Sequence, residues 1–434
     1  MLQALLILSL LSAAASPPAL MHATLLSSEP AAKSTVTTSP TRIRLVFSEE
    51  IEPSLGRIRL VGPGGRVISL KSSGDPRDVS ALLAPITSPL EPGVYRVEWR
   101  IVSEDGHPID GAYSFTVSTP TDSAQSPAIA TPSAAVPTPE PQATIAESDT
   151  AAVRSTLAEV PVVPAALRGL AIGAFAALAG LLGFFTTRRT ATPQPRAARL
   201  VRRLAIAAAV LVPLHFIAWA LAVSPDHSLG GDTIGALLAS GPGKVELARA
   251  VLVLLAAWAL LLARRERLAL LIAFFAILAS SATGHSAAIH PEWGIPGRAL
   301  HLLAVAAWLG GLLWLVTLDR SDAPAAIVEA ERVSSLALTA VIVVTLSGVV
   351  QTRLFLPVWA DLIQSPYGLI VLAKLAGVGV LVLFGAYHRF RVLPRLADEA
   401  VAQAFTVSLR REIVVMSLLV LLGGLLAYLS PPTH

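Results

Sequence analysis

The pattern of apolar and polar residues divides the chain into two unlike stretches. From Pro164 onward, apolar runs of about twenty residues recur, which is the length at which a helix crosses a ~30 Å hydrocarbon core. Before that point, apolar residues alternate with polar ones in short runs, which is typical of half-buried strands. The sequence therefore predicts an all-β N-terminal domain followed by an all-α polytopic membrane domain.

The N-terminal strands are predicted to form one small domain over residues 22–118. Runs such as "TRIRLVF", "GRIRLV", "RVISL", "GVYRVEWRIV" and "AYSFTV" are separated by turn residues in "VGPGG" and "SSGDPRD". Several short strands in so short a stretch favour an immunoglobulin-like sandwich or a Greek-key barrel. Tyr95, Val97, Trp99 and Ile101 alternate along one run, so we expect them to share the buried face.

Two segments flank this domain. Residues 1–21 hold an apolar run of about eleven residues followed by small ones, which is typical of a signal peptide. Residues 119–160 are rich in Ala, Pro, Ser and Thr, so they are predicted to be a linker with a mean reach of about 35 Å. A linker of this kind would leave the N-terminal domain over the membrane without fixing it rigidly there. The membrane domain then occupies residues 161–434.

The membrane domain is predicted to cross the bilayer about eight times. We place the spans near residues 164–186, 200–222, 245–263, 267–283, 298–318, 333–351, 367–388 and 411–430. An exported N-terminus puts the arginine-rich loops in the cytoplasm, whereas the outward loops hold only Lys244, Arg298 and Arg353. This asymmetry satisfies the positive-inside rule. We therefore expect a protein of the bacterial inner membrane, with its N-terminal domain and its C-terminus outside the cytoplasm.

Composition narrows the chemistry. The chain has 434 residues, of which 54% are hydrophobic and 14% are charged, whereas a soluble domain carries about 25% charged residues. Arginines that are sorted by loop indicate membrane orientation and argue against nucleic acid as a partner. The chain has no cysteine and three methionines, which excludes thiolate sites and a thioether-rich Cu(I) site. Imidazole, carboxylate and amine remain as metal ligands.

One motif in the N-terminal domain could bind a metal. In "SEDGHPID", Asp105 and His107 are two residues apart, so in an extended chain they point to the same face. A carboxylate and an imidazole on one face can hold a metal ion, or they can simply end a solvated strand. The spacing alone leaves both interpretations open.

Histidines of the membrane domain concentrate near its outer face. The predicted outer group is His215, His285, His290 and His301. Polar residues inside a span are costly and suggest function, and imidazole is a common metal ligand. Each histidine could instead bond to a neighbouring helix or lie among lipid head groups. We assign His227 and His388 to this alternative, and position alone leaves both interpretations open for the outer group. Lys374 is assigned either to gating or to structural pairing.

Longer motifs resemble a known family. The segment "HATLLSSEPAAKS…RIRLVFSEEIE…GVYRVEWRIVSEDGHPIDGAYSFTV" resembles the periplasmic copper-binding CopC family. The membrane segments "GHSAAIH…RALHLLAVAAWLGGLLWL", "SGVVQTRL…SPYGLIVLAKL" and "LRREIVVMSLLVLLGGLLAYLSPP" resemble CopD. The resemblance to CopC implies Cu(II) ligation by the amine and ring of His22 and by Asp105 and His107, with Glu49 as a weaker candidate.

A CopC–CopD fusion would be a copper-handling membrane protein and not an enzyme. Its exported domain would capture Cu(II), and its membrane domain, which could also take Cu(I), would receive copper at the outer histidines and transport it. The expected partners are the copper ion and the lipid bilayer, with a periplasmic copper chaperone or reductase as a further candidate. No ATP-binding motif is present, so transport would be passive or ion-coupled.

Two other functions remain open from the sequence. Facing histidines in a membrane can be axial ligands of haem, which would make the chain a membrane oxidoreductase. The helices could instead only anchor the N-terminal domain, which would make it a copper-binding module or sensor without transport.

Overall fold

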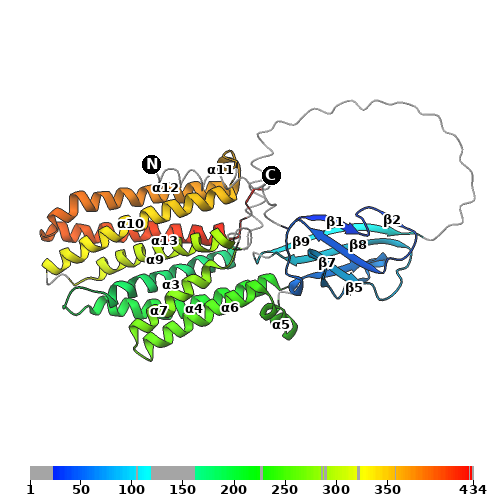
Figure 1. Cartoon of the computed structure of the whole chain (residues 1–434), viewed down its shortest axis with the longest axis horizontal. Helices are drawn as coiled ribbons and strands as arrows, with labels where there is room; N and C mark the ends of the chain where they lie inside the picture. The colour runs from blue at the N-terminus through cyan, green and yellow to red at the C-terminus, as the bar shows by residue number, and fades with distance from the viewer. Residues whose placement is uncertain are drawn as a thin grey trace, which may run out of the picture.

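The computed structural model shows a β-sandwich and a helical bundle that lie end to end (Figure 1). It describes residues 23–103, 106–118, 162–224, 228–284, 287, 291–319, 323–356, 358–429 and 431–432. The predicted signal peptide and linker lie outside these residues. Within them, the N-terminal part is all-β and the C-terminal part is all-α, which confirms the predicted fold class.

Two sheets form the sandwich. One has the strand order β1-β3-β7-β6 and the other the order β2-β9-β8-β4-β5, with antiparallel neighbours except for the parallel pair β2 and β9. The strands are β1 (Leu25–Glu29), β2 (Thr35–Val36), β3 (Arg42–Phe47), β4 (Arg57–Val61), β5 (Val67–Leu70), β6 (Ser73–Asp75), β7 (Asp78–Pro85), β8 (Gly93–Val102) and β9 (Pro108–Val117). The five runs with clear alternation became β3, β4, β5, β8 and β9. The sequence pattern missed β7, whose "ALLA" replaces alternation with a continuous apolar run.

The sandwich core lies between the sheets. The predicted stripe on β8, from Tyr95 to Ile101, is buried as expected. Across the core, the ring of Phe47 on β3 meets that of Trp99 edge to face, with centroids 5.0 Å apart. Burying side chains of this size stabilises the fold by roughly 1.5–3 kcal/mol each, so the alternation of β3 and β8 accounts for the pairing of the two sheets.

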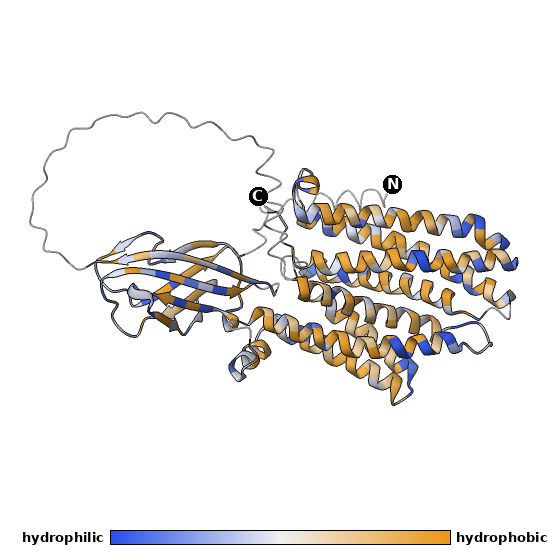
Figure 2. Ribbon diagram, turned by 180° about the vertical axis from the view of Figure 1, so that it is seen from behind, coloured by the Kyte–Doolittle hydropathy of each residue, from blue (hydrophilic) through white to orange (hydrophobic). Residues whose placement is uncertain are grey.

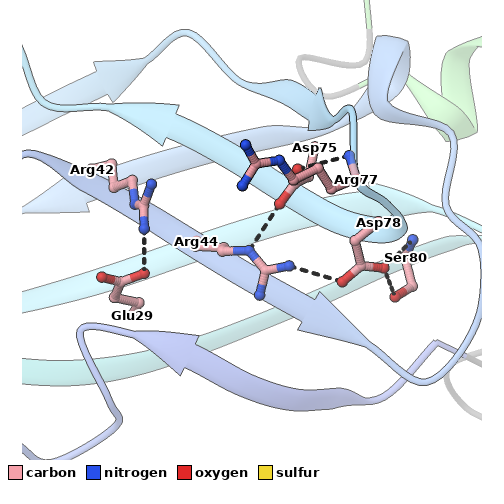
Figure 3. Close-up of polar contacts among 7 residues, drawn as sticks. All are labelled: Glu29, Arg42, Arg44, Asp75, Arg77, Asp78 and Ser80. Carbon is pink, nitrogen blue, oxygen red and sulfur yellow. Dashed lines mark hydrogen bonds and ion pairs between the residues drawn. The ribbon is translucent and has the colours of Figure 1, made fainter.

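Charged residues occupy the outer surface of the four-stranded sheet (Figure 3). Arg44 on β3 donates from Nε to Asp75 Oδ2 at 3.0 Å and from Nη2 to Asp78 Oδ2 at 2.8 Å. The backbone N–H of Arg77 and then the Arg44 guanidinium lower the pKa of Asp75. Hydrogen bonds from Ser80, followed by the Arg44 guanidinium, lower the pKa of Asp78. These contacts join β3, β6 and β7 on the solvent side.

The bundle is built from eight long helices and two short ones among the described residues. The long helices are α3 (Val162–Thr186), α4 (Pro195–Val223), α6 (Gly241–Leu261), α7 (Glu266–Ser281), α9 (Pro291–Thr317), α10 (Ala323–Phe355), α12 (Pro366–Tyr387) and α13 (Glu399–Leu426). The short helices are α5 (Gly231–Ala239) and α11 (Asp361–Gln364). Each predicted span has a long helix, but α9 already begins at Pro291. Arg298, predicted in an outer loop, therefore lies within a helix.

Five helices in the described part of the chain are long and apolar enough to cross a membrane. They are Val162–Thr186, Pro195–Val223, Pro291–Thr317, Pro324–Phe355 and Pro366–Arg395. The other long helices differ from them, because α6 and α13 carry several charged residues and α7 has 16 residues. The predicted number of about eight spans therefore stays a prediction.

Helix α3 lies at the centre of the bundle, where it packs against α4, α7, α9 and α13. A Cβ on Gly180 would overlap the carbonyl of Ala306, and a Cβ on Gly310 would overlap the backbone of Gly180, so α3 and α9 approach closely. Gly169 and Gly424 allow the same approach between α3 and α13. Small residues at such crossings are typical of packing in membranes.

The sandwich contacts one end of the bundle, which we call the near end. Leu55 and Val102 of the sandwich form an apolar cluster with residues of α4 and α5, which are Trp219, Ala220, Val223 and Leu237. Arg100 also donates to the carbonyl of Ala222 at 2.7 Å. The long predicted linker suggested that the sandwich would not be fixed to the membrane domain, but the two are in direct contact. Figure 2 shows hydrophilic residues gathered at the opposite end of the bundle, the far end.

Candidate functional site

The turn between β8 and β9 carries the predicted metal-binding motif to the near end. The backbone N–H of Ser103 donates to the carbonyl of His107 at 3.0 Å, and that of Gly106 donates to the carbonyl of Ser103 at 2.9 Å. Gly106 has a φ of 89°, which favours glycine. These bonds fix the position of His107, while Asp105 lies outside the described residues.

Backbone pairing brings two other segments to the same end of the sandwich. Ser48 and Thr24 bond in both directions, with Thr24 N donating to Ser48 Oγ and Ser48 N to Thr24 O, each at 2.9 Å. Ile51 forms a β-bridge with Ser103. The segment around Glu49 therefore lies between the start of the described chain and the His107 turn. His22 lies outside the described residues.

His107 is in contact with the bundle. It is 8% exposed, and its ring meets the ring of Tyr428 edge to face, with centroids 5.5 Å apart. Next to it, the carbonyl of Gly106 accepts a hydrogen bond of 3.1 Å from Trp219 Nε1. On the other side of the turn, the backbone N–H of Gly241 donates to Glu52 Oε2 at 3.1 Å. His107 thus faces the near end of the bundle.

Tyr428 also contacts His215, which lies on α4 and is fully buried. Its Nδ1 is 2.8 Å from Nη2 of Arg249 and its Nε2 is 3.4 Å from the hydroxyl of Tyr428. Arginine can only donate, so Nδ1 accepts and Nε2 carries the proton. Glu246 Oε2 lies 3.6 Å from Nδ1 and forms an ion pair with Arg249. The Nδ1 lone pair of His215, which a metal would need, is therefore used by Arg249.

His301 on α9 has a different hydrogen-bond pattern. Its Nδ1 lies 2.9 Å from Ser347 Oγ on α10. The Ser347 hydroxyl donates to the carbonyl of Val343 at 2.6 Å, so its oxygen accepts from His301. The proton of His301 is then on Nδ1, and the Nε2 lone pair can bind a metal, as is typical of metal-ligating histidines.

The remaining predicted residues divide into two groups. His227, His285 and His290 lie outside the described residues. His388 Nε2 is 2.8 Å from Ser408 Oγ and its Nδ1 is 3.3 Å from Glu412 Oε2, as expected for a hydrogen-bonded histidine. Lys374 on α12 faces α13 at Gly423. Among the described residues, no group of three or more His, Asp or Glu side chains could hold a metal ion.

Four residues of the near end were not predicted from the sequence, and they are Trp219, Glu246, Arg249 and Tyr428. Glu246 and Arg249 are three residues apart within a predicted span. Charged residues inside a span suggest function, so this pair offered a signal. Trp219 and Tyr428 offered none, because their importance comes from the contact between the two domains.

Two family models match separate parts of the chain. The model described as "CopC domain" matches residues 25–118, and the model described as "Copper resistance protein D" matches residues 328–426. The two matches lie in the sandwich and in the bundle, respectively.

Whole-protein relatives agree with these matches. Protein YobA of Escherichia coli K12 is 37% identical over 102 residues, which are 23% of this chain and 82% of that protein. Copper resistance protein C of Escherichia coli is 40% identical over 109 residues, which are 23% of this chain and 83% of that protein. The copper transport protein CutJ of Bacillus subtilis is 26% identical over 392 residues, and the match spans 85% of this chain and 67% of CutJ.

Solved structures also match the sandwich. CopC from Methylosinus trichosporium OB3b is 29% identical, with 23% of this chain and 98% of that one covered and a TM-score of 0.22. PcoC, a methionine-rich copper resistance protein from Escherichia coli, is 35% identical, with 22% and 98% covered and a TM-score of 0.20.

Proposed function

The chain belongs to the family of CopC–CopD fusions, and we propose that its sandwich captures Cu(II) and passes copper directly to the near end of the bundle for transport across the membrane. Copper handling follows from the family. The ligands, the transfer and the transport are the parts that we propose.

The proposed Cu(II) ligands are the amine and ring of His22, with Asp105 and His107, and Glu49 as a weaker contributor. Cu(II) favours a tetragonal set of nitrogen and oxygen donors, which these groups supply. The pairing of Thr24 with Ser48 and of Ile51 with Ser103 supports this set, because it brings the three segments to one end of the sandwich.

The observation that carries the transfer is the contact between His107 and Tyr428. The His107 ring lies against Tyr428, and the hydroxyl of Tyr428 reaches His215. Copper released from the sandwich would thus meet the bundle without crossing lipid, where a bare charge is strongly disfavoured. A sandwich that was only anchored would not need its metal-binding turn packed against the bundle.

Within the bundle, we propose His301 and His285 as the main copper ligands, with His215 and His290 as weaker ones. The protonation of His301 at Nδ1 supports its role, since it leaves Nε2 for a metal. The hydrogen bond from Arg249 makes His215 a weaker candidate, because copper would have to displace a guanidinium.

Charge supports an orientation with the sandwich outside the cytoplasm. The first turns of α4, which carry Arg196, Arg199, Arg202 and Arg203, lie at the far end, whereas the last turns contact the sandwich. Basic residues favour the cytoplasmic side. We therefore propose that the near end is periplasmic and that copper moves inward from it.

The test is a Cu(II) titration of the full-length protein, purified in detergent. His107→Ala should weaken Cu(II) binding at least tenfold, about 1.4 kcal/mol, because it removes one imidazole ligand. The matched control is His227→Ala, which removes a histidine that the sequence places in an outer loop and outside the proposed ligand set. Unchanged affinity in His107→Ala would show that the sandwich site is misassigned.

An absorption spectrum of the same preparation distinguishes the proposed copper protein from a haem-bearing one. Copper without a Soret band agrees with the proposal. A Soret band that is lost with His215→Ala or His301→Ala would instead favour a haem-bearing oxidoreductase.

A further inference from the structure

Three arginines from three helices come together at the near end of the bundle. They are Arg168 of α3, Arg249 of α6 and Arg298 of α9, and they are close enough to repel one another. Arg249 pairs with Glu246. Within the described part of the chain, Arg168 and Arg298 form no salt bridge, so positive charge exceeds negative charge in this region.

Arg168 has hydrogen-bond donors that no acceptor meets. It is 4% exposed, and its Nε and Nη2 find no acceptor among the described residues. Arg168 also interacts with the side chain of Tyr428, with its Cζ 5.8 Å from the ring centroid, but Tyr428 is a neutral partner. A guanidinium at the far end differs, since Arg332 donates to Thr187 and Glu329. Buried charges are normally paired and hydrogen-bonded, whereas Arg168 has no salt-bridge partner within the described residues.

Arg168 and Arg298 both approach Gly284, which follows α7. A Cβ added to Gly284 would lie 2.9 Å from Nη1 of Arg298 and 3.7 Å from Nη2 of Arg168. Gly284 has a φ of 82°, a conformation that favours a residue without a side chain. Arg298 also donates from Nη1 to the carbonyl of Thr283. The unmet donor of Arg168 and the guanidinium of Arg298 thus converge beside a residue that offers no side-chain acceptor.

We propose that the near end of the bundle binds one small inorganic anion, of which chloride is the representative, between Arg168 and Arg298. The anion accepts hydrogen bonds from the unpartnered Nε and Nη2 of Arg168 and supplies the missing negative charge. Its role in copper transfer rests on the proposed function: the anion offsets the positive charge that would repel a copper cation on its way past His215. Anion binding itself does not require copper.

The test measures thermal unfolding of the full-length protein in zwitterionic lipid nanodiscs, with a chelator that removes copper. Sodium chloride is compared with sodium gluconate at equal ionic strength, because gluconate is a much larger anion than chloride. Chloride should raise the unfolding midpoint by about 3 °C or more, since a ligand that binds only the folded state stabilises it by mass action. Equal midpoints in the two salts would overturn the proposal.

Variants locate the effect. Arg168→Gln should abolish the chloride response and should unfold in gluconate no earlier than the parent, because it removes an uncompensated buried charge. Arg202→Gln, on an exposed part of α4 at the far end, should keep the full response. A full response in Arg168→Gln, or an equal loss of stability in both salts, would show that Arg168 has a purely structural role.

Equilibrium dialysis with radiolabelled chloride gives an independent readout on the parent protein. About one chloride per chain should be retained, and Arg298→Gln should lose it. No retained chloride would overturn the site even if Arg168→Gln failed to fold. Because both experiments are free of copper, their failure would leave the copper proposal untouched.

Discussion

Two buried ionisable side chains, one at each end of the bundle, have opposite hydrogen-bonding environments. At the far end, Glu329 is fully buried and accepts from Arg189 N at 2.5 Å, Trp314 Nε1 at 3.1 Å and Arg332 Nη1 at 3.3 Å. At the near end, Arg168 is also buried, but two of its nitrogens find no acceptor among the described residues. One end surrounds a carboxylate with donors, and the other leaves donors unmet.

The difference between Glu329 and Arg168 indicates which end of the bundle binds a ligand. A buried charge with a full set of partners joins helices, as Glu329 joins α10 to α9 and to the chain after α3. A buried charge without partners destabilises the fold unless a ligand completes it. The end with unmet donors also contacts the sandwich and the turn in which we propose the Cu(II) site. We therefore place ligand binding at the near end and structural pairing at the far end.

The largest expected effect comes from breaking the complete cluster. Glu329→Ala removes the acceptor of three donors and leaves Arg332 without its buried partner, so it should reduce the free energy of unfolding by about 3–5 kcal/mol. Thermal unfolding of the purified full-length protein measures the loss. Glu329→Gln is the matched control, because it keeps one acceptor oxygen, and it should cost less than Glu329→Ala.

The division of roles between the two ends also predicts the copper affinity of these variants. Copper affinity of the folded fraction should be unchanged in Glu329→Ala, since the far end is distant from the sandwich. A stable Glu329→Ala protein with weakened Cu(II) binding would contradict the division of roles between the two ends.

The same contrast explains how much the sequence could predict. Alternation on β8 predicted the buried face from Tyr95 to Ile101, because a strand's period is local and independent of its partners. Apolar length predicted a helix for each span for the same reason. The spacing of Asp105 and His107 left a metal-binding turn and a solvated strand end both open, and only the resemblance to CopC favoured the former. The metal-binding turn stays a prediction because Asp105 lies outside the described residues.

The near end could not be predicted in this way. His215 was chosen for its depth in the membrane, but only the fold shows that Arg249 donates to its Nδ1. Trp219 and Tyr428 matter because residues more than a hundred positions apart meet across the two domains. The composition of the linker suggested a loosely attached sandwich. Composition predicts how far a linker can reach, but it does not predict whether the domains it joins contact each other.

A smaller effect is expected where the two domains meet. Trp219→Phe keeps an aromatic ring in the apolar cluster but removes the donor to the carbonyl of Gly106. Losing one such hydrogen bond costs about 1 kcal/mol, so docking should weaken about fivefold. Cellular copper accumulation should fall, while Cu(II) binding by the purified full-length protein stays at the parent level.

Phe216→Leu is the control for this variant. Phe216 packs against the same cluster but has no hydrogen-bond donor to lose, so accumulation should stay near the parent level. Normal accumulation in Trp219→Phe would favour a sandwich that is only anchored by the helices.

The smallest effect concerns the solvent side of the sandwich, where charges depend on pH. The pKa values of Asp75 and Asp78 are lowered in the folded chain from the ordinary value of 3.8, by hydrogen bonds from Arg77 N and Ser80, respectively, and by Arg44. A lowered folded pKa contributes stability that is fully present above the unfolded pKa and is lost as pH falls through the folded pKa. The unfolding midpoint of the sandwich should therefore decrease below about pH 4, and Asp78→Asn should flatten that decrease.

Glu29→Gln, which breaks the exposed pair with Arg42 on the same sheet, should change the profile little, because exposed ion pairs contribute little. A profile for Asp78→Asn as steep as that of the parent would show that the Arg44 cluster does not couple protonation to folding.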